Sequence, residues 1–398
     1  MDHSRVTIVA HHVVDRCFAR DRCGVNTGLT QSNMRRRIIS SAWFLLLGLL
    51  SSIVGSLASA APATGETRQT LQIYFIDVEG GQSTLIITPE RHSLLIDTGW
   101  AGDGTGFRPG DPHVARDANR IVAAARDAGI TQIDYLLITH FHVDHDGGVT
   151  ELARLMPIRT FIDHSAPSAE ADRASPGTQE AYEAYLTVRN AGAHLQPGAG
   201  ERLPLKDVEA VIVSSSGSTL KGSLANAGAT NASCPDHASV PRDSYENPRS
   251  TGVVVRYGEF RFLDVGDLTG QPLFALACPK SLIGPVDAYL VAHHGGADAA
   301  VPETFAALKP RVAIMNNGVS KGGARVTYEA LHHVPALEDV WQLHASEDAA
   351  DANFPARYVA NLDEGTANWI KLVASEDGSF RVLNQRTGEW KSYPPHSR

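Results

Sequence analysis

The sequence predicts an α/β or mixed layered architecture. Residues 71–96 contain only strand-like segments, whereas strand-like and helix-like segments alternate between residues 115 and 190. Strands followed by alternating strands and helices are typical of layered α/β domains. In addition, one short apolar segment, residues 133–138, leads directly into a loop rich in histidine and aspartate. With 43% hydrophobic and 20% charged residues, the composition is that of an ordinary globular protein.

The N-terminal region has the pattern of an export signal. A basic segment begins at Met34, an apolar stretch occupies residues 38–57, and Ala58-Ser59-Ala60 resembles a cleavage site. These features, in this order, predict a secretory signal peptide at 34–60, a leader at 61–70 and a periplasmic or extracellular protein. Residues 1–33 are then an extension outside the working protein. The alternative is a membrane anchor, because the apolar stretch is nearly long enough to span a bilayer.

Cleavage after Ala60 leaves an acidic protein with two cysteines. The first 60 residues carry seven arginines and three aspartates, so their removal changes the formal charge from −9 to −13. Non-specific nucleic-acid binding depends on lysine and arginine, and we therefore expect no stable nucleic-acid partner. In an oxidising compartment Cys234 and Cys278 can form a disulfide. Two separate buried thiols are the alternative.

The first part of the predicted domain, residues 71–395, is a strand meander followed by alternating elements. Apolar and β-branched segments bounded by turns indicate strands, and apolar residues at helical spacing indicate helices. The expected strands are 71–78, 83–88, 93–96, 133–138 and 160–164, and the expected helices are 115–128, 149–156 and 178–190. Glycine-rich residues 99–112 are expected to form a loop.

The second part repeats this alternation around a long irregular segment. Residues 215–248 are rich in Gly, Ser, Ala and Asn, and a loop of this length is usually functional or mobile. A hairpin is expected at 252–257 and 260–265. The other expected strands are 208–214, 287–292, 312–315, 340–344, 369–373 and 380–383, with helices ending at 310 and spanning 326–333.

The segment Thr139-His140-Phe141-His142-Val143-Asp144-His145-Asp146-Gly147-Gly148 indicates a metal site. Three histidines and a carboxylate fall within six residues immediately after a buried strand. Imidazole and carboxylate ligands together suit zinc or a similar transition ion. A polar loop that happens to be rich in histidine is the alternative.

This motif closely resembles the metal-binding signature of the metallo-β-lactamase fold superfamily, which implies an αββα sandwich. By that resemblance His140 and His142 bind one metal ion, and Asp144 and His145 bind the second. Asp267, which follows a predicted strand and Gly266, resembles the aspartate that bridges both ions. His293-His294-Gly295 resembles the last metal-binding histidine, in a form similar to the hydrolase domain of DNA-uptake competence proteins, and we prefer His294 as the ligand. Asp97 either orients the metal loop or is a simple turn residue.

The resemblance implies a metal-dependent hydrolase that binds two divalent ions, with zinc as the favoured ion, and uses a metal-bound hydroxide as the nucleophile. Asp144 would orient that hydroxide, and either a neighbouring histidine, with His293 as the candidate, or a bound water would protonate the leaving group. The expected substrate is a phosphodiester or another phosphorylated small molecule, with no membrane partner after signal removal. A lactonase or β-lactamase-like hydrolase and a non-catalytic metal-binding module are the alternatives.

One departure from the superfamily weakens the first metal site. The histidine that most members place before the bridging aspartate has no counterpart in sequence context between residues 150 and 266. His164, His194 and His237 lack that context, and Asn247 occupies roughly the corresponding place. We therefore expect the first site to be open or weaker than the second.

Overall fold

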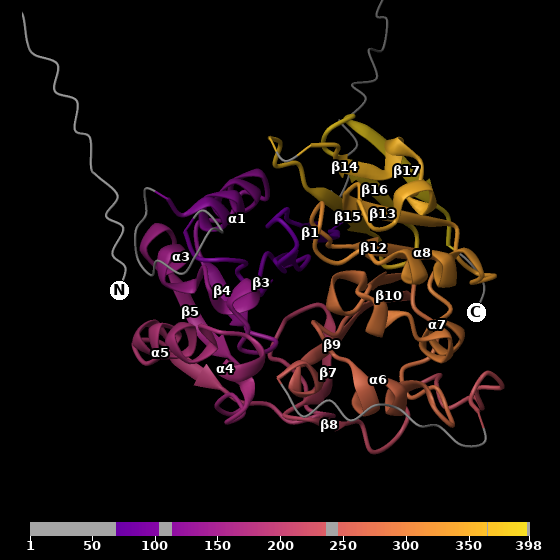
Figure 1. Ribbon diagram of the computed structural model, residues 1–398, viewed down its shortest axis with the longest axis horizontal. Helices are drawn as coiled ribbons and strands as arrows, with labels where there is room; N and C mark the ends of the chain where they lie inside the picture. Colours follow the sequence, from indigo (N-terminus) through magenta and orange to yellow (C-terminus); the bar gives the residue numbers. More distant parts are fainter. Residues whose placement is uncertain (1–68, 103–113, 236–245, 364, 396–398) are drawn as a thin grey trace, which may run out of the picture. The chain divides into compact units, whose positions relative to one another are not determined.

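The structure is a computed structural model that describes residues 69–102, 114–235, 246–363 and 365–395 (Figure 1). All described elements belong to one compact unit, Thr64–Arg398. The predicted signal peptide at 34–60, most of the loop 99–112 and His237 lie outside the described residues. Within the described part of the chain, no helix combines the length and apolar character needed to cross a bilayer.

Nine strands form the first sheet, in the order β17-β16-β15-β1-β2-β3-β4-β5-β6. From β17 to β3 neighbouring strands are antiparallel, and from β3 to β6 they are parallel. The strands are β1 (Leu71–Phe75), β2 (Thr84–Ile87), β3 (Ser93–Ile96), β4 (Ile133–Leu137), β5 (Ile158–Ile162), β6 (Ala193–Leu195), β15 (Ile370–Ala374), β16 (Phe380–Asn384) and β17 (Glu389–Tyr393).

Eight strands form the second sheet, in the order β14-β13-β12-β11-β10-β9-β7-β8. The predicted hairpin is present as β9 and β10, and β10 to β14 run parallel to one another. The strands are β7 (Glu209–Ser215), β8 (Ser218–Thr219), β9 (Gly252–Tyr257), β10 (Phe260–Asp264), β11 (Ala288–Leu290), β12 (Val312–Met315), β13 (Asp339–His344) and β14 (Val359–Asn361).

Helices cover the outer face of each sheet (Figure 1). The helices are α1 (Arg116–Asp127), α2 (Val143–Asp146), α3 (Val149–Leu155), α4 (Ala171–Ala174), α5 (Thr178–Arg189), α6 (Gly270–Ala277), α7 (Pro302–Leu308) and α8 (Arg325–His332). Helices α1, α3 and α5 pack on the first sheet, and α6, α7 and α8 pack on the second.

The central core lies between the two sheets. It contains inward-facing residues of both, such as Ile73 and Phe75 from β1 and Val255 and Phe262 from β9 and β10. Phe75 and Phe262 meet edge to face across the sandwich, with ring centroids 5.7 Å apart. Two further cores lie between each sheet and its helices. This αββα arrangement confirms the fold class that the sequence predicts.

Several short elements were not expected from the sequence. Helix α2 lies inside the metal-binding motif, α6 follows Thr269, and β6, β14 and β17 extend the sheets. Residues of β6 and most of β17 are exposed, so they lack the apolar pattern that marks a buried strand.

Cys234 and Cys278 form a disulfide, with Cα atoms 5.8 Å apart. Of the two alternatives for these cysteines, the structure agrees with the disulfide and not with two separate thiols.

Candidate metal centre

The motif residues sit where β4 ends and α2 begins. After Leu137 the chain leaves the sheet, and α2 turns it so that the amide of His145 donates to the carbonyl of His142 over 2.8 Å. This single helical turn places His142 in one group of ligand atoms and Asp144 and His145 in a second, adjacent group. The packing requires glycine after the turn, because a Cβ on Gly147 would lie 2.2 Å from the carbonyl oxygen of Val143.

The first group of ligand atoms comes from His140, His142 and Asp267. Nε2 of His140 lies 3.0 Å from Nδ1 of His142 and 3.8 Å from Oδ2 of Asp267. His140 is fully buried, and burial lowers its pKa well below the usual range. A neutral imidazole is the form that binds a metal ion.

The second group comes from Asp144, His145, Asp267 and His294. Nε2 of His294 lies 3.2 Å from Oδ2 of Asp144 and 3.3 Å from Oδ1 of Asp267. Nε2 of His145 lies 3.4 Å from Oδ2 of Asp144 and 3.2 Å from Oδ2 of Asp267. All four residues are buried, and Asp267 belongs to both groups.

These atoms fit a pair of metal ions because several of them have no other partner. Among the described residues, no hydrogen bond reaches Nε2 of His142, His145 or His294, or Oδ1 of Asp267, although all four atoms are buried. A buried polar atom without a partner costs free energy, and a metal ion at this point would satisfy these atoms together. Ligand distances near 2 Å to each atom are typical of zinc.

The electrostatics of the centre also favour a cation. Burial alone lowers the pKa of His145, but Asp267, Asp144 and Asp97 outweigh it and hold that pKa well above its usual range. Burial alone raises the pKa of Asp267, whereas the surrounding histidines hold it well below its usual range. The same negative field that stabilises an imidazolium stabilises a divalent ion.

Asp97 orients the metal loop from the end of β3. Its Oδ2 accepts hydrogen bonds from Nδ1 of His145 and from the hydroxyl of Thr139, each 2.7 Å long. Its Oδ1 accepts the amide of Thr139, also over 2.7 Å. With the proton of His145 held on Nδ1, Nε2 is free to bind a metal. Of the two readings of Asp97, the geometry favours the orienting role.

His293 lies beside the centre but outside both groups. Its Nε2 is 3.6 Å from Oδ2 of Asp267 and 3.4 Å from Nδ2 of Asn247, and its Nδ1 is 2.8 Å from Oδ1 of Asp298. Asn247 is buried, and no hydrogen bond from the described residues reaches its Oδ1. The loop therefore directs His294 into the ligand set and holds His293 at its edge.

The structure separates the other candidate histidines from the centre. His164 pairs with Glu246 at 2.9 Å, and His194 pairs with Asp163 at 2.9 Å. Neither belongs to a metal-ligand group of the described residues.

Asp264 is the last residue of β10 and lies three positions before Asp267. It accepts hydrogen bonds from Gln82 and from the amide of Gly266, and burial raises its pKa to about 7.

A third cluster, Asp77, Glu79 and His344, was not foreseen from the sequence. Nε2 of His344 lies 2.8 Å from Asp77, and Arg120 bonds both carboxylates at 3.1 and 3.0 Å. The guanidinium already supplies a cation to both acids, so this cluster is an ion-pair network rather than a metal site. Asp77 and Glu79 lie in the turn after β1, Arg120 lies in α1 and His344 ends β13, so only the tertiary structure brings these residues together.

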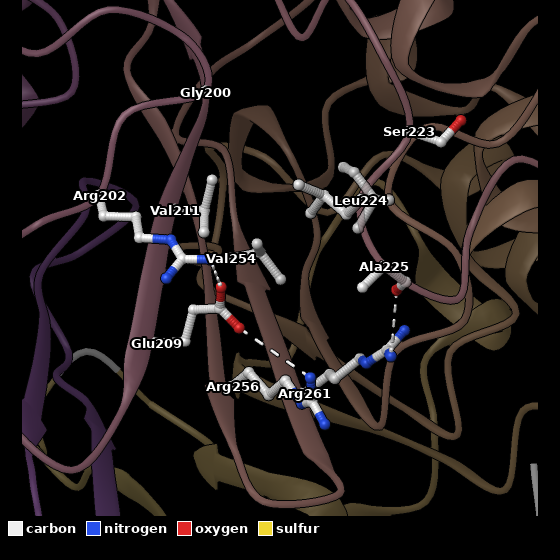
Figure 2. A pocket seen from close by; sticks show the side chains of 11 residues that line it. Gly200, Arg202, Glu209, Val211, Ser223, Leu224, Ala225, Val254, Arg256 and Arg261 are labelled. Carbon is white, nitrogen blue, oxygen red and sulfur yellow. Dashed lines mark hydrogen bonds and ion pairs between the residues drawn. The ribbon is translucent and has the colours of Figure 1, made fainter.

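A cavity of about 270 Å³ lies at the other end of β10 from Asp267 (Figure 2). Figure 2 shows Arg202, Arg256 and Arg261 around an apolar floor that includes Val211 and Val254. Glu209 lies 2.5 Å from Arg202 and 4.0 Å from Arg256, so it offsets part of this charge. None of the lining residues belongs to a metal-ligand group of the described chain, and the cavity is separate from the metal centre.

Comparison with known families gives one match. Residues 76–211 match the family model of the metallo-beta-lactamase superfamily. This segment contains the whole histidine and aspartate motif and ends before Asp267 and His294. The match confirms the superfamily resemblance of the motif, whereas the closer likeness to competence proteins stays a prediction. No curated protein matches the chain.

Solved structures are similar at low sequence identity. A metallo-β-lactamase with a HARLDQ motif from Cronobacter sakazakii is 18% identical, covering 49% of this chain and 60% of that chain, with a TM-score of 0.29. The metallo-β-lactamase fold protein YhfI from Bacillus subtilis is 10% identical, covering 69% and 96%, with a TM-score of 0.41. CmlA, a diiron β-hydroxylase from Streptomyces venezuelae, is 17% identical, covering 68% and 48%, with a TM-score of 0.38. The chain therefore spans less than two thirds of the Cronobacter and Streptomyces proteins.

Proposed function

From the metallo-β-lactamase fold of this chain we propose that the protein is an exported metal-dependent hydrolase that acts on phosphodiesters or other phosphorylated small molecules. The observation that carries this proposal is the pair of buried ligand groups that share Asp267. A shared carboxylate between two groups is the arrangement expected of a two-metal hydrolase site.

Zinc is the ion that these donors suit best. The two groups offer imidazole nitrogens from His140, His142, His145 and His294 and carboxylate oxygens from Asp144 and Asp267. Imidazole with carboxylate suits zinc and related transition ions, whereas magnesium and calcium prefer sites built from oxygen alone.

Each residue has a defined task in this proposal. His140, His142 and Asp267 would hold the first ion, and Asp144, His145, Asp267 and His294 would hold the second. Bound divalent ions lower the pKa of a water ligand and stabilise the attacking and leaving oxygens of a displacement. Asp144 orients the attacking water, and Asp97 keeps His145 in the tautomer that leaves Nε2 free for the ion.

His293 is placed to move a proton. Asp298 accepts a hydrogen bond from Nδ1, so the other ring nitrogen, Nε2, faces Asp267 at the edge of the centre. We assign to Nε2 the proton that the leaving oxygen takes up when the ester bond breaks. The side-chain amide of Asn247 lies beside the same nitrogen, with its Nδ2 3.4 Å away.

The test combines metal analysis with a substrate panel on the exported protein. We expect two equivalents of metal and hydrolysis of a generic phosphodiester such as bis(p-nitrophenyl) phosphate. Asp267→Ala should abolish turnover and release metal while the far-ultraviolet spectrum stays native, because its carboxylate belongs to both ligand groups.

The panel also separates the competing functions. Preferential turnover of lactones or β-lactams would replace the phosphodiesterase proposal with a lactonase or β-lactamase-like activity. One bound metal and no turnover of any ester, lactone or phosphodiester would favour a non-catalytic binding module. The binding of a single metal ion has a structural reason, because the first group has only three ligand residues, one of which is shared with the second group.

A further inference from the structure

Lys321 contacts the metal centre from the opposite half of the chain. It lies in the loop between β12 and α8, where its ammonium group donates to the carbonyl of Gly80 over 2.8 Å and contacts Oδ2 of Asp144. The ammonium also lies 5.0 Å from the centroid of the Trp100 ring. Lys321 thus reaches the edge of the second ligand group without belonging to it.

The loop that carries Lys321 is tied to the loop that carries His294. The amide of Gly323 donates to the carbonyl of His294 over 2.8 Å, and the amide of Gly318 donates to the carbonyl of Lys321 over 2.8 Å. A Cβ on Gly322 would lie 2.4 Å from the carbonyl oxygen of His294, so the two loops are in direct contact. The position of Lys321 is therefore set together with that of a metal ligand.

A metal ion in the second ligand group would compete with Lys321 for the carboxylate of Asp144. With an ion bound, the carboxylate of Asp144 would be one of its ligands, and its attraction for the ammonium group would weaken. Lys321 keeps the carbonyl of Gly80, but a carbonyl does not neutralise a charge.

The loaded centre attracts anions. Two divalent ions would add positive charge beside the ammonium group of Lys321, opposite the carboxylates of Asp144, Asp267 and Asp97. The side chain of Lys321 is 39% exposed, so its ammonium group can meet a ligand that enters from solvent. A low-dielectric site with net positive charge binds an oxyanion in preference to a neutral carbonyl group.

We propose that Lys321 binds a non-bridging oxygen of a phosphodiester held at the metal centre and thereby selects anionic over neutral substrates. The inference rests on the proposed hydrolase function and narrows its substrate class. Lys321 is a substrate-binding residue in this scheme: its ammonium group donates a charge-assisted hydrogen bond to the phosphoryl oxygen. No covalent bond to Lys321 forms or breaks.

The test uses two variants and a control on the zinc-loaded, exported protein. Lys321→Gln removes the charge but keeps an amide that can donate to the carbonyl of Gly80. Lys321→Arg keeps the charge. Lys221→Met removes the charge of an exposed lysine that belongs to no metal-ligand group of the described chain.

Calorimetric titration with inorganic phosphate measures anion binding without turnover. We expect Lys321→Gln to weaken phosphate binding about tenfold, in line with the loss of one charge-assisted hydrogen bond. Lys321→Arg and Lys221→Met should stay close to the parent protein, and metal content should not change in any variant. Equal phosphate affinity in Lys321→Gln and the parent would overturn the proposal.

Steady-state kinetics provide a second test, which compares kcat/KM for an anionic and a neutral ester. With Lys321→Gln, kcat/KM for bis(p-nitrophenyl) phosphate should fall about tenfold while kcat/KM for the neutral p-nitrophenyl acetate stays within about twofold. An equal fall for both esters would mean that Lys321 only supports the Gly80 turn. If the parent hydrolyses no phosphodiester but binds phosphate through Lys321, the anion site stands and the proposed activity fails.

Discussion

Asp97 shows how a single side chain outside the ligand set controls the metal centre. It lies at the end of β3 with a φ of 60°, a backbone conformation that only glycine, asparagine and aspartate adopt readily. From there its two oxygens take three hydrogen bonds from Thr139 and His145. The carboxylate thus fixes both the start of the motif loop and the tautomer of one ligand.

Asp97→Asn should therefore weaken metal binding without unfolding the protein. Asparagine tolerates the same φ, but its amide group would face Nδ1 of His145 and favour the tautomer with the proton on Nε2. We expect the affinity of the second site to fall by about 10- to 100-fold, as is usual when the hydrogen-bond partner of a ligand is lost. Competition with a chromophoric chelator measures this change. Asp207→Asn, at an exposed aspartate with a φ of 61°, is the matched control.

Equal zinc affinity in Asp97→Asn and Asp207→Asn would show that Asp97 plays no part in metal binding. In that case Asp97 would be a turn residue whose contacts serve only the backbone of the loop.

At the scale of elements, the metal centre depends on how closely the loops pack. The turn after β1 lies against the motif loop: the amide of Gln82 donates to the carbonyl of Asp144 over 3.1 Å. A Cβ on Gly81 would lie 2.5 Å from that carbonyl oxygen and 3.2 Å from Nε1 of Trp100. The absence of a side chain at Gly81 lets the two loops approach each other.

Gly81→Ala should displace the motif loop. The added methyl group meets a backbone carbonyl that cannot turn away, so we expect a loss of about 1–3 kcal/mol in the free energy of unfolding. Zinc binding at the second site should weaken in parallel. Thermal denaturation and zinc titration measure both effects. Gly222→Ala is the control, because no heavy atom lies within 4 Å of the added Cβ.

A Gly81→Ala protein with unchanged stability and zinc affinity would mean that the turn moves freely, and the close packing described above would not matter to the centre.

At the scale of the whole domain, the ligands come from both sheets. His140, His142 and His145 follow a strand of the first sheet, whereas Asp267 and His294 follow strands of the second. An ion held by both sets links the two halves of the sandwich. Metal binding is then coupled to the stability of the whole fold.

Metal removal should lower the melting temperature in two unequal steps. The first group has three ligand residues and the second has four, so a chelator should empty the first site before the second. A ligand present at 100 times its Kd stabilises the native state by about 2.7 kcal/mol, which a calorimetric scan resolves. Titration of stripped protein should likewise give two different affinities.

Two equal, tight sites would show that another residue completes the first group. Asn247→Ala tests one such residue, because its buried amide adjoins His293. If Asn247 supplies the missing ligand, this change should widen the difference between the two sites.

We propose that residues 34–60 are a signal peptide that is removed when the protein is exported. Met34 and the three arginines after it precede an apolar stretch and Ala58-Ser59-Ala60. Mass spectrometry of the secreted or periplasmic protein should find an N-terminus at Ala61. A protein that keeps residues 38–57 and sediments with membranes would be anchored instead.

Local patterns were enough to predict most elements and four of the six candidate metal ligands. Strands such as β3 and β12 have the bounds that their apolar segments predict. His140, His142, Asp144 and His145 could be grouped from the sequence because they fall within six residues of one loop. Covalent geometry keeps such residues together whatever the rest of the chain does.

The superfamily resemblance pointed to Asp267 and His294, but only the tertiary structure brings these distant residues, and Lys321, next to the motif. Lys321 reaches Asp144 across 177 positions, and the choice between His293 and His294 depends on a loop in which both residues have positive φ. The Cys234–Cys278 bridge and the Arg120 network with Asp77, Glu79 and His344 depend on the same packing. Sequence spacing carries no information on these distances, because they arise from the way two sheets and their loops pack against each other.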